Sequence, residues 1–279
     1  MKLGFCTGLS EESIKFAADA GFMCLEIFAG GDLIDPNTTT KDKIKKARAL
    51  LDQHGIAAST VFHYEDYAAP DEAASKKAWN NLKKTMDIAE GLGTSIVTCN
   101  AWVPGSASLA DKFKFYKKSF STFAKWFEDR GMKLAIENCP HDFHNISWNV
   151  ANWEVMFNEV PSEAIGLEYD PSHLVWQQID YLAALRKFAS RIYAFHAKDT
   201  QVLRDVVSVY GMNGGKSWWR FRVPGYGDVC WKSIFQILSD IDYKGDMVIE
   251  HEDPVFDGPR RQEGLKLGLK CLETFVVQQ

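Results

Sequence analysis

The stretch Leu134-Ala135-Ile136-Glu137 is apolar until its last residue, which is a carboxylate. Three more short, mostly apolar runs end in a residue that can bind a metal ion: Leu167-Glu168-Tyr169-Asp170, Tyr193-Ala194-Phe195-His196 and Met247-Val248-Ile249-Glu250. Runs of this kind are typical of buried parallel strands. A charged group at the end of such a strand is costly to bury unless it is paired or bound to a metal. The repeated ending therefore predicts a site at one rim of a parallel barrel.

The rest of the chain continues the alternation of short apolar runs and amphipathic stretches. We expect strands over 3–6, 24–28, 56–62, 95–99, 134–137, 167–170, 193–196 and 247–250. We expect helices over 11–20, 43–54, 71–90, 111–130, 148–157, 180–188, 231–239 and 260–275. Strand and helix alternate throughout without a break in composition. The pattern predicts an α/β fold, a (β/α)8 TIM barrel that forms a single domain over 1–279.

The segment 200–228 is the longest stretch without a clear pattern, and we expect it to be a long loop after the seventh strand. It is rich in glycine and carries Trp218 and Trp219. Long aromatic loops on the catalytic rim of a barrel commonly cover a binding site. We therefore expect 210–222 to fold over the site as a lid, with an oligomer contact as the alternative, because exposed tryptophans also mark interfaces.

Composition and charge exclude several classes of protein. With 46% hydrophobic and 25% charged residues, the chain can form a large core and is not expected to be disordered. The net charge is −5 and no long basic run is present, which argues against a nucleic-acid partner. No stretch reads as a signal peptide or a membrane span, and the scattered cysteines fit free thiols. These features predict a cytoplasmic protein with no membrane partner.

Glu137, Asp170, His196 and Glu250 are the expected metal ligands. Carboxylates and an imidazole suit one divalent ion, with Mn²⁺ foremost and Mg²⁺, Co²⁺ and Zn²⁺ as alternatives. The simpler alternative is that these residues are polar strand ends that face solvent. If His196 binds the ion, its second ring nitrogen needs an acceptor, and Asp199 is the candidate.

Five further residues are expected to contact the substrate. His173 follows Asp170 by three positions and can lean over the same site, and Lys198 and Arg222 can reach substrate oxygens. His63 ends the third expected strand, and Trp102 follows the fourth. Aromatic rings around a polar centre suit a sugar, whose apolar faces stack on rings. For each residue alone, packing or solvent exposure is the alternative.

Several longer motifs carry a family resemblance. They are Ile136-Glu137-Asn138, Asp170-Pro171-Ser172-His173, His196-Ala197-Lys198-Asp199, Arg222-Val223-Pro224-Gly225-Tyr226-Gly227 and Glu250-His251-Glu252-Asp253. Through them the chain resembles the xylose-isomerase-like TIM barrels, the sugar phosphate isomerase/epimerase group that includes D-tagatose 3-epimerase. The resemblance implies that Glu137, Asp170, His196 and Glu250 hold one metal ion. It also implies that Glu137 and Glu250 are the catalytic acid/base pair and that His173 and Arg222 contact the sugar.

The resulting expectation is a divalent-metal-dependent sugar isomerase or epimerase that acts through an enediolate. A first alternative is a dehydratase or lyase that performs β-elimination on a keto-sugar or keto-glycoside, because the same enediolate can expel a leaving group. A second alternative is a non-catalytic sugar-binding barrel. The expected partner is a small-molecule sugar, and a homo-oligomer is possible.

Overall fold

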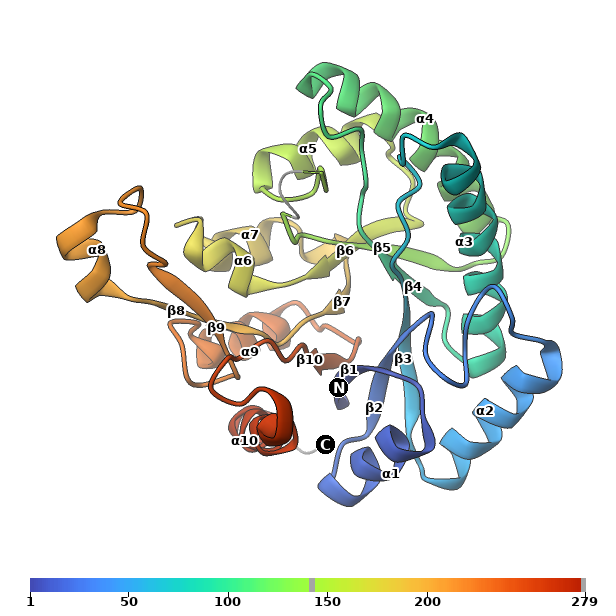
Figure 1. Cartoon of the computed structure of the whole chain (residues 1–279), viewed down its shortest axis with the longest axis horizontal. Coiled ribbons are helices and arrows are strands. Elements are labelled where there is room, and N and C mark those ends of the chain that lie inside the picture. The colour runs from blue at the N-terminus through green and yellow to red at the C-terminus, as the bar shows by residue number, and fades with distance from the viewer. Residues whose placement is uncertain (141–143, 277–279) are drawn as a thin grey trace.

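The centre of the molecule is a barrel of eight parallel strands (Figure 1). The structure is a computed structural model and describes residues 1–140 and 144–276. The strand order is β10-β1-β2-β3-β4-β5-β6-β7, and a bridge between His196 and Val248 joins the two ends of the sheet. The strands are β1 (Leu3–Gly8), β2 (Cys24–Phe28), β3 (Ala57–His63), β4 (Ile96–Cys99), β5 (Lys133–Glu137), β6 (Ile165–Tyr169), β7 (Ile192–Phe195) and β10 (Met247–Ile249). The expected TIM-barrel fold is confirmed.

Helices surround the barrel, and the apolar core lies between the two layers (Figure 1). Large side chains such as Tyr116, Phe120 and Trp153 are fully buried there. The outer helices are α1 (Glu11–Ala20), α2 (Lys41–Gln53), α3 (Glu72–Leu92), α4 (Leu109–Glu128), α5 (Val150–Glu159), α7 (Tyr181–Lys187), α9 (Trp231–Asp240) and α10 (Arg261–Glu273). Local signals set their ends: Ser10 caps α1 by accepting from the Ser13 amide, and Gly21 ends it with φ of 91°.

A short helix not expected from the sequence follows β6. This helix, α6 (Pro171–Trp176), begins at Asp170, whose side chain accepts a hydrogen bond from the Ser172 amide. Proline at the first helical position suits such a start, because its missing N–H would be unpaired there anyway. The helix turns the chain directly above the end of β6, so Asp170 and His173 stay at the rim.

The expectation that 200–228 is one long irregular loop is wrong. Its first part is a hairpin of β8 (Asp199–Val202) and β9 (Trp219–Arg222), with α8 (Arg204–Tyr210) between the strands. Antiparallel pairing satisfies backbone groups that a bare loop would leave to solvent. Figure 1 shows α8 projecting away from the barrel at the left, and no residue of α8 is buried. Only β9 returns to the rim, so most of the expected lid does not lie over the site.

Among the described residues, no helix combines the length and the apolarity that crossing a bilayer requires. All six cysteines have free thiols, as expected.

Candidate active site

The carboxyl ends of β5, β6, β7 and β10 bring the expected metal ligands together. Nδ1 of His196 lies 3.4 Å from Oε1 of Glu137 and 3.3 Å from Oε2 of Glu250. Oδ2 of Asp170 lies 3.3 Å from Nε2 of His173, which in turn is 3.6 Å from Oε1 of Glu137. We call Glu137, Asp170, His173, Lys198 and Glu250 the rim cluster.

The Asn138 side chain ties the end of β5 to the backbone of Asp170, which follows β6. Its Nδ2 donates to the Asp170 carbonyl at 2.9 Å, and its Oδ1 accepts from the Asp170 amide at 2.8 Å. Since Oδ1 of Asp170 accepts from the Ser172 amide, only Oδ2 is left to face the rim cluster. The side chain of Asn138 thereby holds Glu137 and Asp170 at a fixed spacing.

Lys198 is fully enclosed among the acids of the rim. Its Nζ lies 2.5 Å from Oε2 of Glu250, 2.8 Å from Oε2 of Glu252 and 3.2 Å from Oδ2 of Asp170. The ammonium also sits 4.4 Å from the centre of the Phe221 ring on β9. Sequence reasoning treated Lys198 as a substrate contact and missed Glu252, which the motif after Glu250 could have indicated.

The acids and bases of the rim cluster shift one another's pKa values. Burial would raise the pKa of Glu250, but the Lys198 ammonium and His196 bring it down to about 2. The pKa of Glu137 is likewise well below its usual value despite burial, because His173, His196 and Lys198 favour its charged form. Burial opposes the charge on Lys198, yet Glu250, Asp170 and Glu252 hold its pKa well above the usual value.

The donor atoms of the rim suit a bound cation. Within residues 1–140 and 144–276, Oε1 of Glu137, Oδ2 of Asp170 and Nδ1 of His196 are buried and make no hydrogen bond. Glu137, Asp170, Glu250 and His173 offer ligand atoms within 4.8 Å of one another. Between the two histidines we favour His196, because Nε2 of His173 already faces Nζ of Lys198 at 3.2 Å. A hard, oxygen-rich set of this kind fits a divalent ion.

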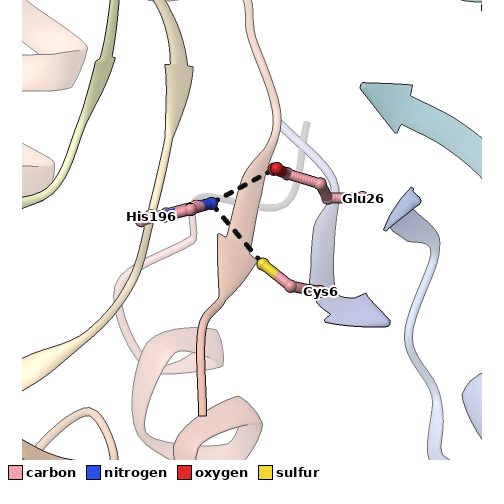
Figure 2. Close-up of side chains that lie close together, drawn as sticks. All are labelled: Cys6, Glu26 and His196. Atoms are coloured by element: carbon pink, nitrogen blue, oxygen red, sulfur yellow. Dashed lines mark hydrogen bonds and ion pairs between the residues drawn. The ribbon is translucent and has the colours of Figure 1, made fainter. Parts of the chain in front are cut away.

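A second group of polar side chains lies inside the barrel and faces the other ring nitrogen of His196, and Figure 2 shows two of them, Glu26 and Cys6, pointing toward this ring. Nε2 of His196 lies 3.2 Å from Oε2 of Glu26 and 3.5 Å from Sγ of Cys6. It also lies 3.2 Å from Oε1 of Glu168. We call Cys6, Glu26 and Glu168 the inner cluster. Burial and the charge of Glu26 raise the pKa of Glu168 well above its usual value, and burial does the same for Cys6.

The inner cluster replaces the expected partner of His196. Asp199 does not contact this ring: its carboxylate accepts from the amides of Gly225 and Val229 and from the Trp231 indole, each at 3.0 Å. The expectation for Asp199 is therefore wrong. It lies on β8, which has left the barrel, and it organises the turn after β9. Neither Glu26 nor Glu168 was expected as a partner of His196, although charged residues inside apolar strand runs were a usable signal.

The structure brings some expected substrate contacts to the rim but not others. Arg222 lies at the end of β9, with Nε 3.0 Å from Oδ2 of Asp253. His63 turns outward instead: its Nδ1 lies 3.2 Å from Oγ1 of Thr85 on α3, and burial lowers its pKa to about 4. The expectation that His63 faces the substrate is thus not met, because the last residue of β3 alternates away from the barrel interior.

Aromatic rings border the rim cluster on two sides. On one side, Trp176 and Trp219 stack at 4.9 Å with an interplanar angle of 6°, and Phe221 packs edge-on against His173 at 5.3 Å. On the other side, Trp102 packs edge-on against Tyr64 at 5.7 Å. Burial raises the pKa of Tyr64, and so do the charges of Cys139, Glu137 and Glu250. Trp176 and Tyr64 were not predicted from the sequence.

Comparisons with known proteins agree on the fold. A family model described as "Xylose isomerase-like TIM barrel" matches residues 14–275. The chain is 30% identical over 201 residues to an inosose dehydratase of Glaesserella parasuis serovar 5, covering 63% of this chain and 64% of that protein. It therefore spans slightly less than two thirds of that relative's length.

Solved structures with a similar fold include enzymes of two kinds. The probable 3-DHS dehydratase AsbF of Bacillus anthracis has a TM-score of 0.77 and 15% identity, covering 98% of this chain and 99% of that one. A D-psicose 3-epimerase of Clostridium cellulolyticum H10 has a TM-score of 0.75 and 18% identity, covering 99% of both chains. At these identities the likeness shows the fold alone.

Proposed function

Since the chain belongs to the xylose isomerase-like TIM barrel family, we propose that it is a metal-dependent enzyme that eliminates a β-leaving group from a keto-sugar or related keto-polyol. The observation that carries the proposal is Lys198, a buried ammonium held directly among the rim carboxylates. Elimination needs a base beside the carbonyl and an acid at the leaving oxygen. The rim cluster contains both kinds of group within a few ångströms.

The expected ligand set serves the first half of the reaction. An ion held by Glu137, Asp170, His196 and Glu250 would polarise the substrate carbonyl and stabilise the negative charge that develops on proton loss. Between the two glutamates, Glu137 is the proposed base, because Oε2 of Glu250 is occupied by Lys198.

Glu137 and Lys198 carry out the proton transfers that the elimination requires. Glu137 takes the proton from the carbon beside the carbonyl, and the electron pair of that C–H bond forms a C=C bond as the C–O bond to the leaving group breaks. Lys198 protonates the departing oxygen, and the proton held by Glu137 then restores Lys198. When the leaving group is hydroxyl, the net change is the loss of one water molecule.

The aromatic border suits this class of substrate. Phe221, Trp176 and Trp219 present flat apolar surface next to His173 and Lys198, where the C–H faces of a sugar ring can stack. Arg222, His173 and Trp102 remain proposed substrate contacts. Similarity to an inosose dehydratase supports elimination over isomerisation.

Epimerisation or isomerisation is the second candidate. Glu137 and Glu250 both approach His196 Nδ1, an arrangement in which one carboxylate could remove a proton and the other return it. Both candidates share the first proton transfer and diverge only after it.

The decisive experiment incubates the enzyme with Mn²⁺ and a panel of keto-sugars and keto-inositols in D₂O, read by mass spectrometry. We expect a product that has lost water or an aglycone. In Lys198→Met, elimination should fall by about 10²–10⁴-fold while deuterium uptake beside the carbonyl continues. Lys114→Met is the matched control, because Lys114 is an exposed lysine on the outer helix α4, where it pairs with Asp111.

Other outcomes separate the candidates. Deuterium uptake with a product of unchanged composition would favour the second candidate. Elimination by Lys198→Met at a rate within about tenfold of the wild type would remove Lys198 from the mechanism. Sugar binding without any exchange would leave a non-catalytic barrel.

A further inference from the structure

His196 lies between two sets of acids, and its two ring nitrogens have different surroundings. Nδ1 faces Glu137 and Glu250 in the rim cluster, and Nε2 faces the inner cluster. A neutral imidazole carries a proton on only one nitrogen, and the other offers a lone pair. Which nitrogen carries it decides whether the lone pair points to the proposed metal site or into the barrel.

Glu26 has the geometry to make this choice. Its Oε2 forms a hydrogen bond with Nε2 of His196 at 3.2 Å, and its Oε1 accepts from Oγ1 of Thr98 at 3.0 Å. The side chain is fully buried, so its direction is fixed by these two contacts and by the strand that carries it. An acceptor held at Nε2 favours the tautomer with the proton there.

The other two members of the inner cluster are weaker partners for Nε2. Oε1 of Glu168 is at the same distance as Oε2 of Glu26, but neither oxygen of Glu168 makes a hydrogen bond within the described residues. The Cys6 sulfur lies 3.5 Å away, and a thiol is a weak acceptor. Among these three, Glu26 alone combines an oxygen acceptor with a suitable direction.

We propose that Glu26 is a positioning residue that accepts the Nε2–H of His196 and so keeps the Nδ1 lone pair directed at the proposed metal site. Glu26 touches neither substrate nor ion and acts only through the imidazole. The inference rests on the proposed function, because it assigns His196 as a ligand. It extends that function from the rim into the second layer of the barrel.

The first test measures Mn²⁺ affinity by competition with a chromophoric chelator, on folded protein. Glu26→Leu removes the acceptor and is expected to weaken binding by about 10–100-fold, as loss of such a partner typically does. Glu26→Gln keeps the size and an acceptor oxygen but not the charge, and should lie between Glu26→Leu and the wild type. If Glu26→Leu does not fold, Glu26→Gln still tests the proposal through a weakened affinity.

A second readout reports the imidazole itself. In the metal-free wild type, at a pH high enough for the His196 imidazole to be neutral, ¹⁵N-resolved histidine spectra should show the proton on Nε2 and a bare Nδ1. In Glu26→Leu the two tautomers should mix. A purely structural role for Glu26 would lower the melting temperature without changing this pattern, so a retained pattern would overturn the proposal.

Matched controls use the neighbours of Glu26. Glu168→Gln should retain Mn²⁺ affinity, because Glu168 makes no hydrogen bond to the ring. Thr98→Val keeps the Glu26 carboxylate but removes its second contact, and should weaken binding less than Glu26→Leu. Wild-type affinity in both Glu26 variants overturns the inference, and so does binding of two ions per chain, which would make the inner cluster a ligand set. If the wild type binds no divalent ion, the proposed function fails as well.

Discussion

The rim cluster and the inner cluster are two groups of buried acids on either side of one imidazole, and their charge is balanced differently. The rim cluster contains its own cation, Lys198, whose Nζ faces Glu250 and Asp170. The inner cluster has no lysine or arginine partner within the described residues, and its carboxyl Glu168 has a strongly raised pKa. Buried acids with a nearby cation can stay charged and bind ions, whereas a buried acid that lies beside another acid, as Glu168 lies beside Glu26, tends to be neutral. Similar residue types therefore predict different chemistry at the two levels.

Removal of divalent ions should separate the two clusters most clearly. Because the ion would stabilise developing charge by several kcal/mol, exhaustive chelation is expected to lower turnover by at least about 10³-fold, with recovery on adding Mn²⁺. Saturation at about 100 times Kd should also raise the unfolding free energy by about 2.7 kcal/mol. Thermal unfolding with and without Mn²⁺ checks this, and Asp170→Asn should lose the response. Full activity after chelation would contradict an ion-dependent rim.

Neutralising the proposed base, Glu137, should cause the next largest loss of activity. Glu137→Gln keeps the size of the side chain but cannot accept a proton, so turnover and deuterium exchange should both fall by about 10²–10⁴-fold. The control is Glu263→Gln, an exposed glutamate that forms an ion pair with Arg260. A loss in Glu137→Gln no larger than in the control would remove Glu137 as the base.

A glutamate-to-glutamine substitution in the inner cluster should stabilise the protein, whereas the one in the rim cluster should impair activity. Glu168 is fully buried without a hydrogen bond in the described structure, so Glu168→Gln should raise the unfolding free energy at pH 7 by about 1–3 kcal/mol. The raised pKa sets the pH dependence: above the unfolded-state pKa the wild type must bind a proton on folding, which lowers its stability. The gain should therefore shrink below about pH 4.3, where unfolded glutamate is also protonated. Urea titrations at both pH values measure it, and a loss of stability at pH 7 would contradict a neutral Glu168.

The smallest effect is expected at the aromatic border. Trp219→Ala removes the stack on Trp176 and is expected to weaken substrate binding by about tenfold, within the range for one buried aromatic contact. Trp218→Ala, one residue further from the rim, is the matched control. Steady-state kinetics and size-exclusion chromatography of both variants distinguish the roles. A change in oligomer size with unaltered kinetics would assign this segment to an interface between subunits.

The sequence allowed the barrel and the rim to be predicted because both depend on local patterns. Apolar runs of strand length and a terminal carboxylate are visible without knowing any contact, and the strand-end positions of Glu137, Asp170 and Glu250 were predicted in this way. The inner cluster depends on contacts between distant strands: Glu26 on β2 meets His196 after β7, and no local pattern encodes that pairing. Glu168 lies two residues before Asp170, and residues two apart in a strand point to the same face, so its inward direction could have been deduced.

The predictions that Asp199 is the partner of His196 and that 200–228 is an irregular loop were wrong for a different reason. The spacing His-x-Lys-Asp suggested a partner for the imidazole, but the chain leaves the barrel within that motif and pairs with β9. The strand of Trp219–Arg222 lies after a glycine-rich turn, which masks its pattern. Local sequence reveals which residues end a strand, but not where the chain goes after it.

The bridge between His196 and Val248 makes the join between β7 and β10 the loosest in the barrel. Each other pair of neighbouring strands shares at least three residue pairs, whereas this one has a single bridge and one hydrogen bond from the Ala197 amide to the Val248 carbonyl at 2.7 Å. An ion bound by His196, which follows β7, and by Glu250, which follows β10, would link these two strands and strengthen the closure of the barrel. Binding of the ion should then slow hydrogen exchange at the Ala197 amide, so the exchange rate of this amide reports whether the metal site is occupied.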